Sequence, residues 1–177
     1  KIIRSSEYIK EVDIQNAISM IREAKRPYIL VGGGAVISDA ADELKEFAEK
    51  VDAPVCDTLM GKGAFNGTDE RYSGMLGMHG TKASNLGVSH CDLLIAVGTR
   101  FSDRVLGNPK TFAKNAKILQ IDVDPVEINK NICVSASIIG DVKAVLTVIN
   151  RRLEAQEHKE WLDTVKEYKE KYPLTYD

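Results

Sequence analysis

The sequence lacks the features that mark membrane-spanning, disulfide-linked and nucleic-acid-binding chains. No apolar run approaches the roughly 20 residues that cross a bilayer, and residues 1–6 are polar rather than signal-like. The three cysteines, Cys56, Cys91 and Cys133, form no CxxC pair and have no clustered histidine beside them, which disfavours a disulfide framework and a zinc site. The 24 basic and 26 acidic side chains are scattered, so no basic face is offered to phosphate backbones or anionic lipid. We therefore expect a soluble, cytoplasmic protein with no nucleic-acid or membrane partner.

Length and composition indicate one globular domain. Hydrophobic residues make up 44% of the 177 residues and charged residues 28%, a balance that supports a buried core. We expect residues 1–177 to form a single domain with its core over about 11–155 and a polar tail over 156–177. The chain begins with Lys1 rather than Met and stops in a polar stretch, so we expect it to be part of a longer protein.

The hydrophobic pattern predicts alternating strands and helices. Short apolar runs predict five strands buried on both faces, at residues 28–31, 53–56, 93–97, 118–123 and 132–139. Apolar stripes at helical spacing predict helices at residues 13–25, from after Ser38 to Val51, and at 81–91 and 142–153. We expect Asp13 to cap the first helix and Pro27 to end it. This alternation predicts an α/β fold: a three-layer, doubly wound, Rossmann-like parallel sheet in the order 3-2-1-4-5-6 or a close variant.

Residues that follow the predicted strands have the chemistry of a nucleotide site. In doubly wound folds, ligands bind beyond the carboxyl ends of the strands. Glycines let the backbone approach a pyrophosphate, arginine adds a fixed bidentate cation, and a carboxylate can accept hydrogen bonds from ribose hydroxyls. The segments that combine these features are Gly32–Gly34, Asp57–Met60, Gly98–Arg100, Asp122–Val123 and Gly140–Val142.

Each of these features also has a purely structural interpretation. Three consecutive glycines often form only a turn, and the third position of a GxGxxG motif is occupied here by Ile37. A histidine between glycines, such as His79, is more often a loop residue than a catalyst. Asp122 is as compatible with simply ending its strand as with contacting a ligand. Asp141 is as compatible with capping the last helix as with contacting a ligand. Arg100 and Arg104 are also compatible with solvated side chains or with ion pairs to Asp103.

Five longer segments together resemble the middle, FAD-binding domain of acetolactate synthase catalytic subunits, a family of thiamine-diphosphate enzymes. They read VGGG from Val31, TLMGKG from Thr58, MLGMHGT from Met75, VGTRFSDRV from Val97 and IDVDPVEI from Ile121. The resemblance runs from about the first helix to about residue 150. The LGMHG and GTRFSDRV segments are its most specific part.

This resemblance implies an enzyme that condenses two pyruvates to 2-acetolactate and CO2, or joins pyruvate to 2-oxobutyrate, in branched-chain amino-acid synthesis. It implies thiamine diphosphate and Mg²⁺ on flanking domains, a structural FAD on this domain, a homo-oligomer and a possible regulatory small subunit. This domain alone would be inert, because no GDG segment, which holds the diphosphate and Mg²⁺ in the family, occurs in the chain. The residues that the resemblance assigns to FAD are Gly32, Gly33, Gly34, Thr58, Leu59, Met60, Leu76, Gly77, Met78, His79, Gly98, Thr99, Arg100, Asp103, Arg104, Val105, Asp122, Val123, Asp141 and Val142.

Three other interpretations remain open at this point. The chain is also compatible with the middle domain of a related thiamine enzyme, such as a pyruvate oxidase, a glyoxylate carboligase or an FAD-free catabolic acetolactate synthase. A second alternative is a stand-alone NAD- or FAD-binding module whose flavin is redox-active. A third is an interaction domain that has kept the fold without the ligand.

Overall fold

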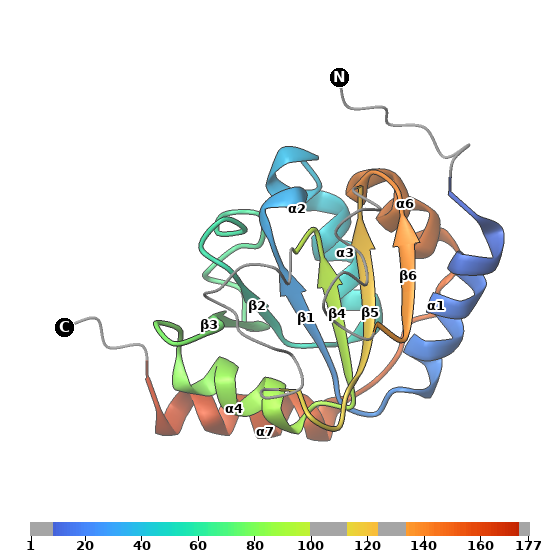
Figure 1. The fold of residues 1–177 in the computed structure, drawn as a ribbon. Helices are drawn as coiled ribbons and strands as arrows, with labels where there is room; N and C mark the ends of the chain where they lie inside the picture. The colour runs from blue at the N-terminus through green and yellow to red at the C-terminus, as the bar shows by residue number, and fades with distance from the viewer. Residues whose placement is uncertain (1–8, 100–112, 124–133, 174–177) are drawn as a thin grey trace.

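The computed structural model describes residues 9–99, 113–123 and 134–173 and is built around a six-stranded sheet (Figure 1). Every strand pairing in the sheet is parallel. In chain order the strands are β1 (Pro27–Val31), β2 (Val55–Asp57), β3 (Tyr72–Met75), β4 (Leu93–Val97), β5 (Lys117–Asp122) and β6 (Ala136–Ile139). Their spatial order is β3-β2-β1-β4-β5-β6. The predicted doubly wound α/β fold and strand order are confirmed.

Helices cover both faces of this sheet, because alternate strand residues point to opposite sides. The helices are α1 (Glu11–Glu23), α2 (Gly33–Ile37), α3 (Ala41–Val51), α4 (Lys82–His90), α6 (Val142–Arg152) and α7 (Lys159–Lys171). Ile29 and Val31 of β1 belong to a buried cluster with α1, α3 and α6. Tyr28 and Leu30 belong to a second cluster with α4 and α7, which lie together at the bottom of Figure 1. Within the described ranges, no helix has the length and apolar character needed to cross a bilayer.

Several predicted helix boundaries are wrong. Helix α1 begins at Glu11, so Asp13 lies inside its first turn, and the residue before the helix, Lys10, makes no side-chain capping bond. The helix has already ended at Glu23, and Pro27 is instead the first residue of β1. An acidic residue near a helix start fits either position, since a carboxylate also interacts favourably with the helix dipole from within the first turn.

Two elements were absent from the sequence prediction, and Ser38 has a different partner from the one expected. Strand β3 lies in the glycine-rich stretch that was expected to be loop, and the short helix α2 begins inside the glycine turn. Ser38 follows α2, while α3 begins after Ala40. The Ser38 hydroxyl accepts a hydrogen bond from the Lys143 backbone N–H at 2.9 Å, which caps the distant helix α6.

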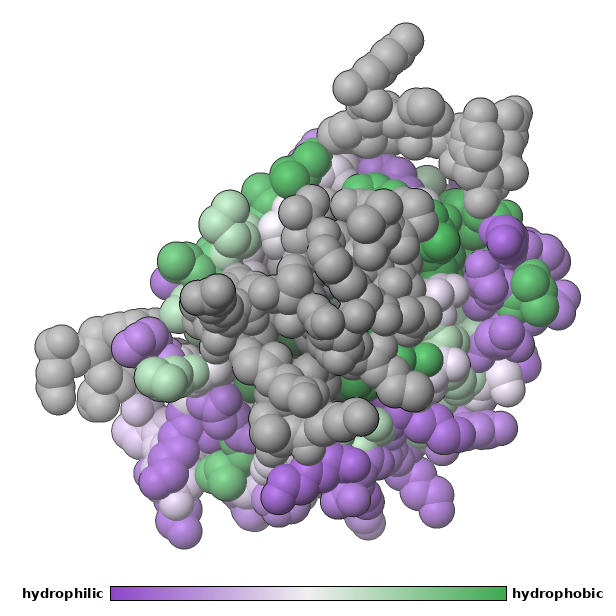
Figure 2. Space-filling view, in the orientation of Figure 1, coloured by the Kyte–Doolittle hydropathy of each residue, from purple (hydrophilic) through white to green (hydrophobic). Residues whose placement is uncertain are grey.

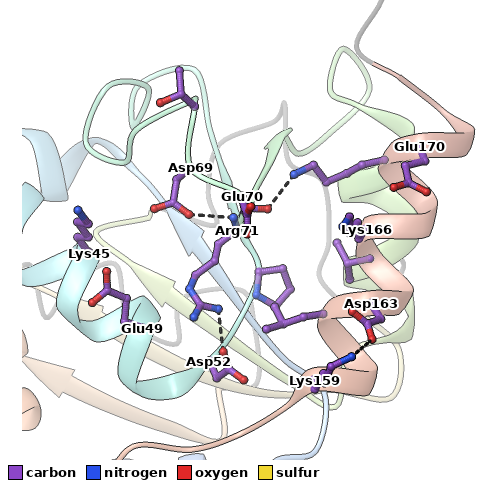
Figure 3. Close-up of a pocket in the computed structure, with 15 residues that line it drawn as sticks. Lys45, Glu49, Asp52, Asp69, Glu70, Arg71, Lys159, Asp163, Lys166 and Glu170 are labelled. Atoms are coloured by element: carbon purple, nitrogen blue, oxygen red, sulfur yellow. Dashed lines mark hydrogen bonds and ion pairs between the residues drawn. The ribbon is translucent and has the colours of Figure 1, made fainter.

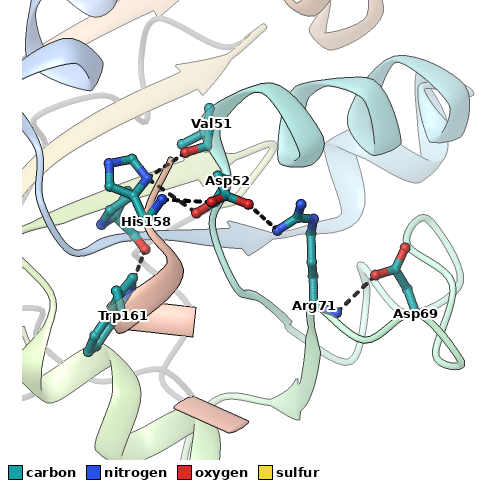
Figure 4. A network of polar contacts seen from close by, with 7 residues as sticks. Val51, Asp52, Asp69, Arg71, His158 and Trp161 are labelled. Carbon is teal, nitrogen blue, oxygen red and sulfur yellow. Dashed lines mark hydrogen bonds and ion pairs between the residues drawn. The ribbon is translucent and has the colours of Figure 1, made fainter. Parts of the chain in front are cut away.

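The stretch that was expected to be a polar tail forms α7, which is tied to the fold by a polar network at its start (Figure 4). The two ring nitrogens of His158 lie 2.8 Å from the Val51 carbonyl oxygen and 3.0 Å from the Ala24 carbonyl oxygen. The backbone N–H of His158 donates to Asp52 at 2.7 Å, and Asp52 pairs with Arg71 at 2.9 Å. This network fixes the start of α7 against the ends of α1 and α3.

Apolar contacts complete the attachment of α7. Trp161 and Val165 are one turn apart and are both buried against the face that carries α4. The indole Nε1–H of Trp161 donates to the Pro27 carbonyl oxygen at 2.8 Å, and its ring meets the Tyr28 ring edge-on with centroids 6.2 Å apart. Residues 158–171 are therefore an integral part of the second face of the sheet.

Candidate functional site: the carboxyl edge of the sheet

The turns after β1 and β4 pack directly against each other at the carboxyl edge of the sheet. A Cβ atom on Gly32 would lie 2.4 Å from the carbonyl oxygen of Gly98 and 2.6 Å from the Cα atom of Thr99. Both distances are far inside ordinary van der Waals contact, so Gly32 is required by backbone packing. The structural interpretation of this glycine is correct, whatever ligand the edge binds.

Most backbone N–H groups of these turns already donate within the protein. The N–H of Gly32 donates to Val97 at 2.9 Å, that of Gly34 to Gly98 at 3.0 Å, and that of Gly98 to Ile121 at 2.8 Å. Gly33 differs, because its N–H donates to no acceptor among the described residues. Within this triple glycine, Gly33 is therefore the N–H that remains available to an anionic ligand.

The turn after β2 presents apolar side chains above a closed backbone. The Thr58 hydroxyl accepts a hydrogen bond from the Gly61 N–H at 3.2 Å, and the Thr58 N–H donates to the Val31 carbonyl oxygen at 2.9 Å. Leu59 and Met60 between them are both more than 70% exposed. Thr58 thus shapes the turn, while Leu59 and Met60 are free to contact a ligand.

The loop after β3 lies beside that turn, because β3 pairs with β2 in parallel. Leu76 is buried, and its N–H donates to the Asp57 carbonyl oxygen at 2.9 Å. Gly77 has a φ of +112°, a backbone conformation that side chains disfavour. Met78 is 89% exposed, and His79 is also exposed. The structure therefore brings the predicted loop residues 76–79 next to Leu59 and Met60.

Two buried carboxylates lie at the carboxyl edge, one as the last residue of β5 and one just after β6. Asp122 accepts a hydrogen bond from the Val123 N–H at 2.7 Å. Asp141 caps α6 by accepting from the Ala144 N–H at 3.1 Å, so its structural interpretation is correct. Its other oxygen, Oδ1, is buried and has no hydrogen-bond partner among the described residues. A buried acceptor without a donor is uncommon in native structures, so this oxygen is a candidate ligand contact.

The side chains of Thr99 and Val142 do not face the edge. The Thr99 hydroxyl is buried and donates to the Leu30 carbonyl oxygen at 3.4 Å. Val142 is fully buried in the core cluster beneath α6. Any ligand contact by these two residues would have to use backbone atoms. Arg100, Asp103, Arg104 and Val105 lie outside the described residues.

Asp57 is a buried carboxylate at the end of β2, which the sequence singled out among the strand-end residues but which is not among the residues that the resemblance assigns to FAD. Its Oδ1 accepts a hydrogen bond from the Tyr72 hydroxyl at 2.9 Å, whereas its Oδ2 is buried without a hydrogen-bond partner among the described residues. Burial raises the pKa of this carboxyl, and the Tyr72 hydrogen bond opposes that rise. Its position after an apolar strand run was visible in the sequence, but its burial was not.

Exposed apolar side chains concentrate on the same edge. They belong to α2, to the turns after β2, β3 and β5, and to the end of β6, and they are Val36, Ile37, Leu59, Met60, Met78, Val123 and Ile139. Figure 2 shows hydrophobic residues gathered along the upper left of the molecule, near α2. Clustered exposed apolar groups of this kind mark surfaces that bind a ligand or another protein surface.

A cavity of about 1060 Å³ lies away from this edge, at the amino ends of β2 and β3 (Figure 3). It is lined mainly by charged side chains of α3, α7 and the loop before β3. Several of these are already paired, as in the Arg71–Asp52 and Lys159–Asp163 ion pairs. Because most of the side chains that line it are charged and several already neutralise one another, we place the candidate site at the carboxyl edge.

Neither metal nor thiol chemistry is evident in the described part of the chain. Across residues 9–99, 113–123 and 134–173, no three His, Cys, Asp or Glu side chains are grouped as metal ligands. Burial raises the pKa of the Cys91 thiol to about 12 and also raises the pKa of Cys56, so both thiols stay protonated and unreactive near neutral pH.

The chain also matches a known protein family. Residues 14–149 match the central domain of thiamine pyrophosphate enzymes. The chain belongs to this family. This match favours the interpretation as the central domain of a thiamine enzyme over a stand-alone nucleotide-binding module or an interaction domain.

Individual relatives of this central domain are more specific than the family match. It is 50% identical over 161 residues to a probable acetolactate synthase large subunit of Methanocaldococcus jannaschii, covering 89% of this chain and 27% of that protein. It is 44% identical over 169 residues to an acetolactate synthase large subunit of Cyanidium caldarium, covering 92% and 29%. A third relative, from Corynebacterium glutamicum, is 43% identical over 169 residues, covering 93% and 27%. The resemblance indicated by the motifs is confirmed, and the chain spans less than a third of the length of these relatives.

Proposed function

We propose that this central domain belongs to an acetolactate synthase large subunit, a transferase that condenses two pyruvates to 2-acetolactate and CO2 or joins pyruvate to 2-oxobutyrate. The similarity to acetolactate synthase large subunits over about nine-tenths of the chain carries this proposal. In this proposal the enzyme acts in branched-chain amino-acid synthesis and works in the cytoplasm.

We propose FAD as the ligand of the carboxyl edge, and four features of the described residues fit it. The Gly33 N–H is available to a pyrophosphate oxygen, and the buried Oδ1 of Asp141 has no donor of its own. Asp122 is a second buried carboxylate that can accept from ribose hydroxyls. The exposed apolar side chains beyond β2 and β3 can cover a flat aromatic ring. Arg100 would add a fixed cation for the diphosphate.

In this proposal the domain binds and positions rather than reacts. Thiamine diphosphate, held with Mg²⁺ by flanking domains, supplies the carbanion chemistry. The residues of this chain hold FAD, which has no redox role in a condensation without net electron transfer. They also cover the flavin on one side, and Asp103 and Arg104 are assigned to the mouth of the active site. The domain alone is therefore expected to be inactive, and the whole enzyme to be a homo-oligomer that can associate with a regulatory small subunit.

The reaction is tested with the full-length protein. Supplied with pyruvate, thiamine diphosphate, Mg²⁺ and FAD, it is expected to form acetolactate and CO2. Formation of acetaldehyde or acetyl phosphate without acetolactate would instead assign the chain to another thiamine enzyme, such as a pyruvate oxidase. Omitting each cofactor in turn shows which of them the reaction needs.

The flavin site is tested separately by binding. The FAD content and FAD affinity of the full-length protein are compared with those of the Arg100→Ala and Asp122→Ala variants, using flavin absorbance and fluorescence. Both variants are expected to hold less FAD, because one loses the cation at the diphosphate and the other loses an acceptor for the ribose. Unchanged content and affinity in both would refute the proposed site.

A further inference from the structure

The loop between β3 and α4, residues 76–80, is closed at its base by backbone hydrogen bonds. The Thr81 N–H donates to the Met75 carbonyl oxygen at 2.9 Å, and the Gly80 N–H donates to Gly77 at 3.0 Å. The Thr81 hydroxyl donates to the Ser73 carbonyl oxygen at 2.6 Å and accepts from the Ser84 N–H at 3.1 Å. The two ends of the loop are therefore fixed to β3 and to the first turn of α4.

One side chain from α4 holds the middle of this loop. The Oδ1 atom of Asn85 accepts a hydrogen bond from the Gly77 N–H at 3.1 Å. Its Nδ2 atom donates to the Gly77 carbonyl oxygen at 2.9 Å and to the Thr81 carbonyl oxygen at 3.0 Å. Asn85 therefore binds both backbone polar groups of Gly77, in the positive-φ conformation that glycine allows.

The part of the loop beyond Gly77 has little internal packing of its own. Met78 is 89% exposed and His79 is exposed, so neither side chain is anchored in the core. The direction in which the chain leaves Gly77 is set by the φ that Asn85 fixes. The positions of Met78 and His79 on the carboxyl edge thus depend on the amide of Asn85, which belongs to the helix that follows the loop, α4.

We propose that Asn85 is a positioning residue of the ligand site: it holds loop 76–80 so that Met78 and His79 face the bound dinucleotide. This role rests on the proposed FAD site. An amide is suited to the task because it offers an acceptor and two donors on one rigid plane, which matches the N–H of Gly77 and the two carbonyl oxygens. Asn85 acts through the loop and does not itself touch the ligand.

The test compares FAD affinity with loop order in the full-length protein. Asn85→Ala is expected to weaken FAD binding about tenfold or more, since it leaves polar groups of the loop unpaired. It is also expected to speed hydrogen exchange in residues 76–80 but not in β1. Ser89→Ala is the matched control, because Ser89 lies on the same helix and its hydroxyl has only local partners, the Leu86 carbonyl oxygen at 2.8 Å and the neighbouring His90 Nδ1 atom at 3.0 Å. This control should match the wild type in both measurements.

A second variant gives a signature that a general loss of stability does not produce. Asn85→Asp keeps the shape and the acceptor for the Gly77 N–H but places an ionised oxygen against two carbonyl oxygens. Protonation of the new carboxyl restores a donor. Relative to the wild type at each pH, FAD affinity in Asn85→Asp should recover as the pH falls from 8 to 5, while Asn85→Ala shows no recovery.

Three outcomes would overturn the role of Asn85. If the wild type binds FAD and Asn85→Ala binds it equally well, this role is wrong and the FAD site stands. If exchange speeds up equally in β1 and in loop 76–80, Asn85 serves general stability instead. If the wild type binds no FAD at any concentration tested, both the FAD site and the role of Asn85 fail together.

Discussion

The two neighbouring glycines Gly32 and Gly33 should respond in opposite ways to the same substitution. A Cβ on Gly32 would lie 2.4 Å from a carbonyl oxygen and 2.6 Å from a Cα atom, both in the backbone of the Gly98 turn. Neither atom can move without shifting β4. Overpacking against rigid neighbours costs about 1–3 kcal/mol, which for a domain of this size lowers the Tm by about 2–12 °C. Gly32→Ala is therefore expected to destabilise the fold.

At Gly33 the added methyl group meets a milder contact. Its nearest neighbour is the Cβ atom of Met60 at 3.2 Å, so the turn that carries the exposed Met60 needs to shift by only a few tenths of an ångström. Gly33 is also helical, and alanine is the better helix former by about 0.5–1 kcal/mol. We expect the Tm of Gly33→Ala to stay within a few degrees of the wild type. Alanine keeps the backbone N–H, but its methyl group would stand beside it and hold a phosphate away, so FAD affinity should fall about 10- to 100-fold, as if one hydrogen bond to a charged phosphate were lost.

Thermal unfolding followed by circular dichroism and FAD titration of the same samples separate the two effects. The expected result is a low Tm for Gly32→Ala and a near-normal Tm with weak FAD binding for Gly33→Ala. A Gly32→Ala variant as stable as the wild type would contradict the packing argument. A Gly33→Ala variant that binds FAD normally would show that the phosphate does not come close to the backbone at Gly33.

Three further substitutions test the structural framework. Trp161→Phe removes the donor to the Pro27 carbonyl oxygen and is expected to lower the free energy of unfolding by about 1–3 kcal/mol, measured by urea unfolding monitored by circular dichroism. If residues 158–171 were a solvent-exposed tail, the substitution would leave this free energy unchanged. Ser38→Ala removes the acceptor for the Lys143 N–H and is expected to lower the free energy of unfolding by about 1 kcal/mol in the same assay. An unchanged free energy of unfolding would exclude this capping role. Burial raises the folded-state pKa of Asp57, so the free energy of unfolding of the wild type should fall as the pH rises from about 4 through that raised pKa. In Asp57→Asn this decline should be absent. Parallel pH profiles of the two proteins would contradict the raised pKa of Asp57.

The sheet could be predicted from the sequence because its central strands are buried on both faces. Such strands are continuous apolar runs, as in Tyr28–Val31 and Leu93–Val97, and each ends at a glycine. Strand β3 could not be found in this way. Its sequence, Tyr-Ser-Gly-Met, contains a glycine and a serine, and its place at the sheet edge is set by pairing with β2 rather than by its own propensity.

Partners far away in the sequence explain the other differences. Ser38 resembles a cap for the helix that follows it, but its hydroxyl meets an N–H 105 residues later. Helix α7 is highly charged, and only Trp161 and Val165 among its residues are buried, so its apolar stripe is too narrow to stand out. Rules that use only neighbouring residues cannot predict contacts of this kind, because the two partners meet only after the chain has folded.

At the candidate site, the sequence predicted segments, whereas only the structure shows which of their atoms remain available. The N–H groups of Gly32 and Gly34 and one oxygen of Asp141 satisfy other backbone groups of the fold. The Gly33 N–H and the Oδ1 of Asp141 do not, so the same short segments serve stability and recognition through different atoms. A buried polar atom without a partner costs about 1–3 kcal/mol, and a ligand that supplies the partner recovers this free energy. A dinucleotide bound here would therefore stabilise the fold as it binds, through linkage between the two equilibria.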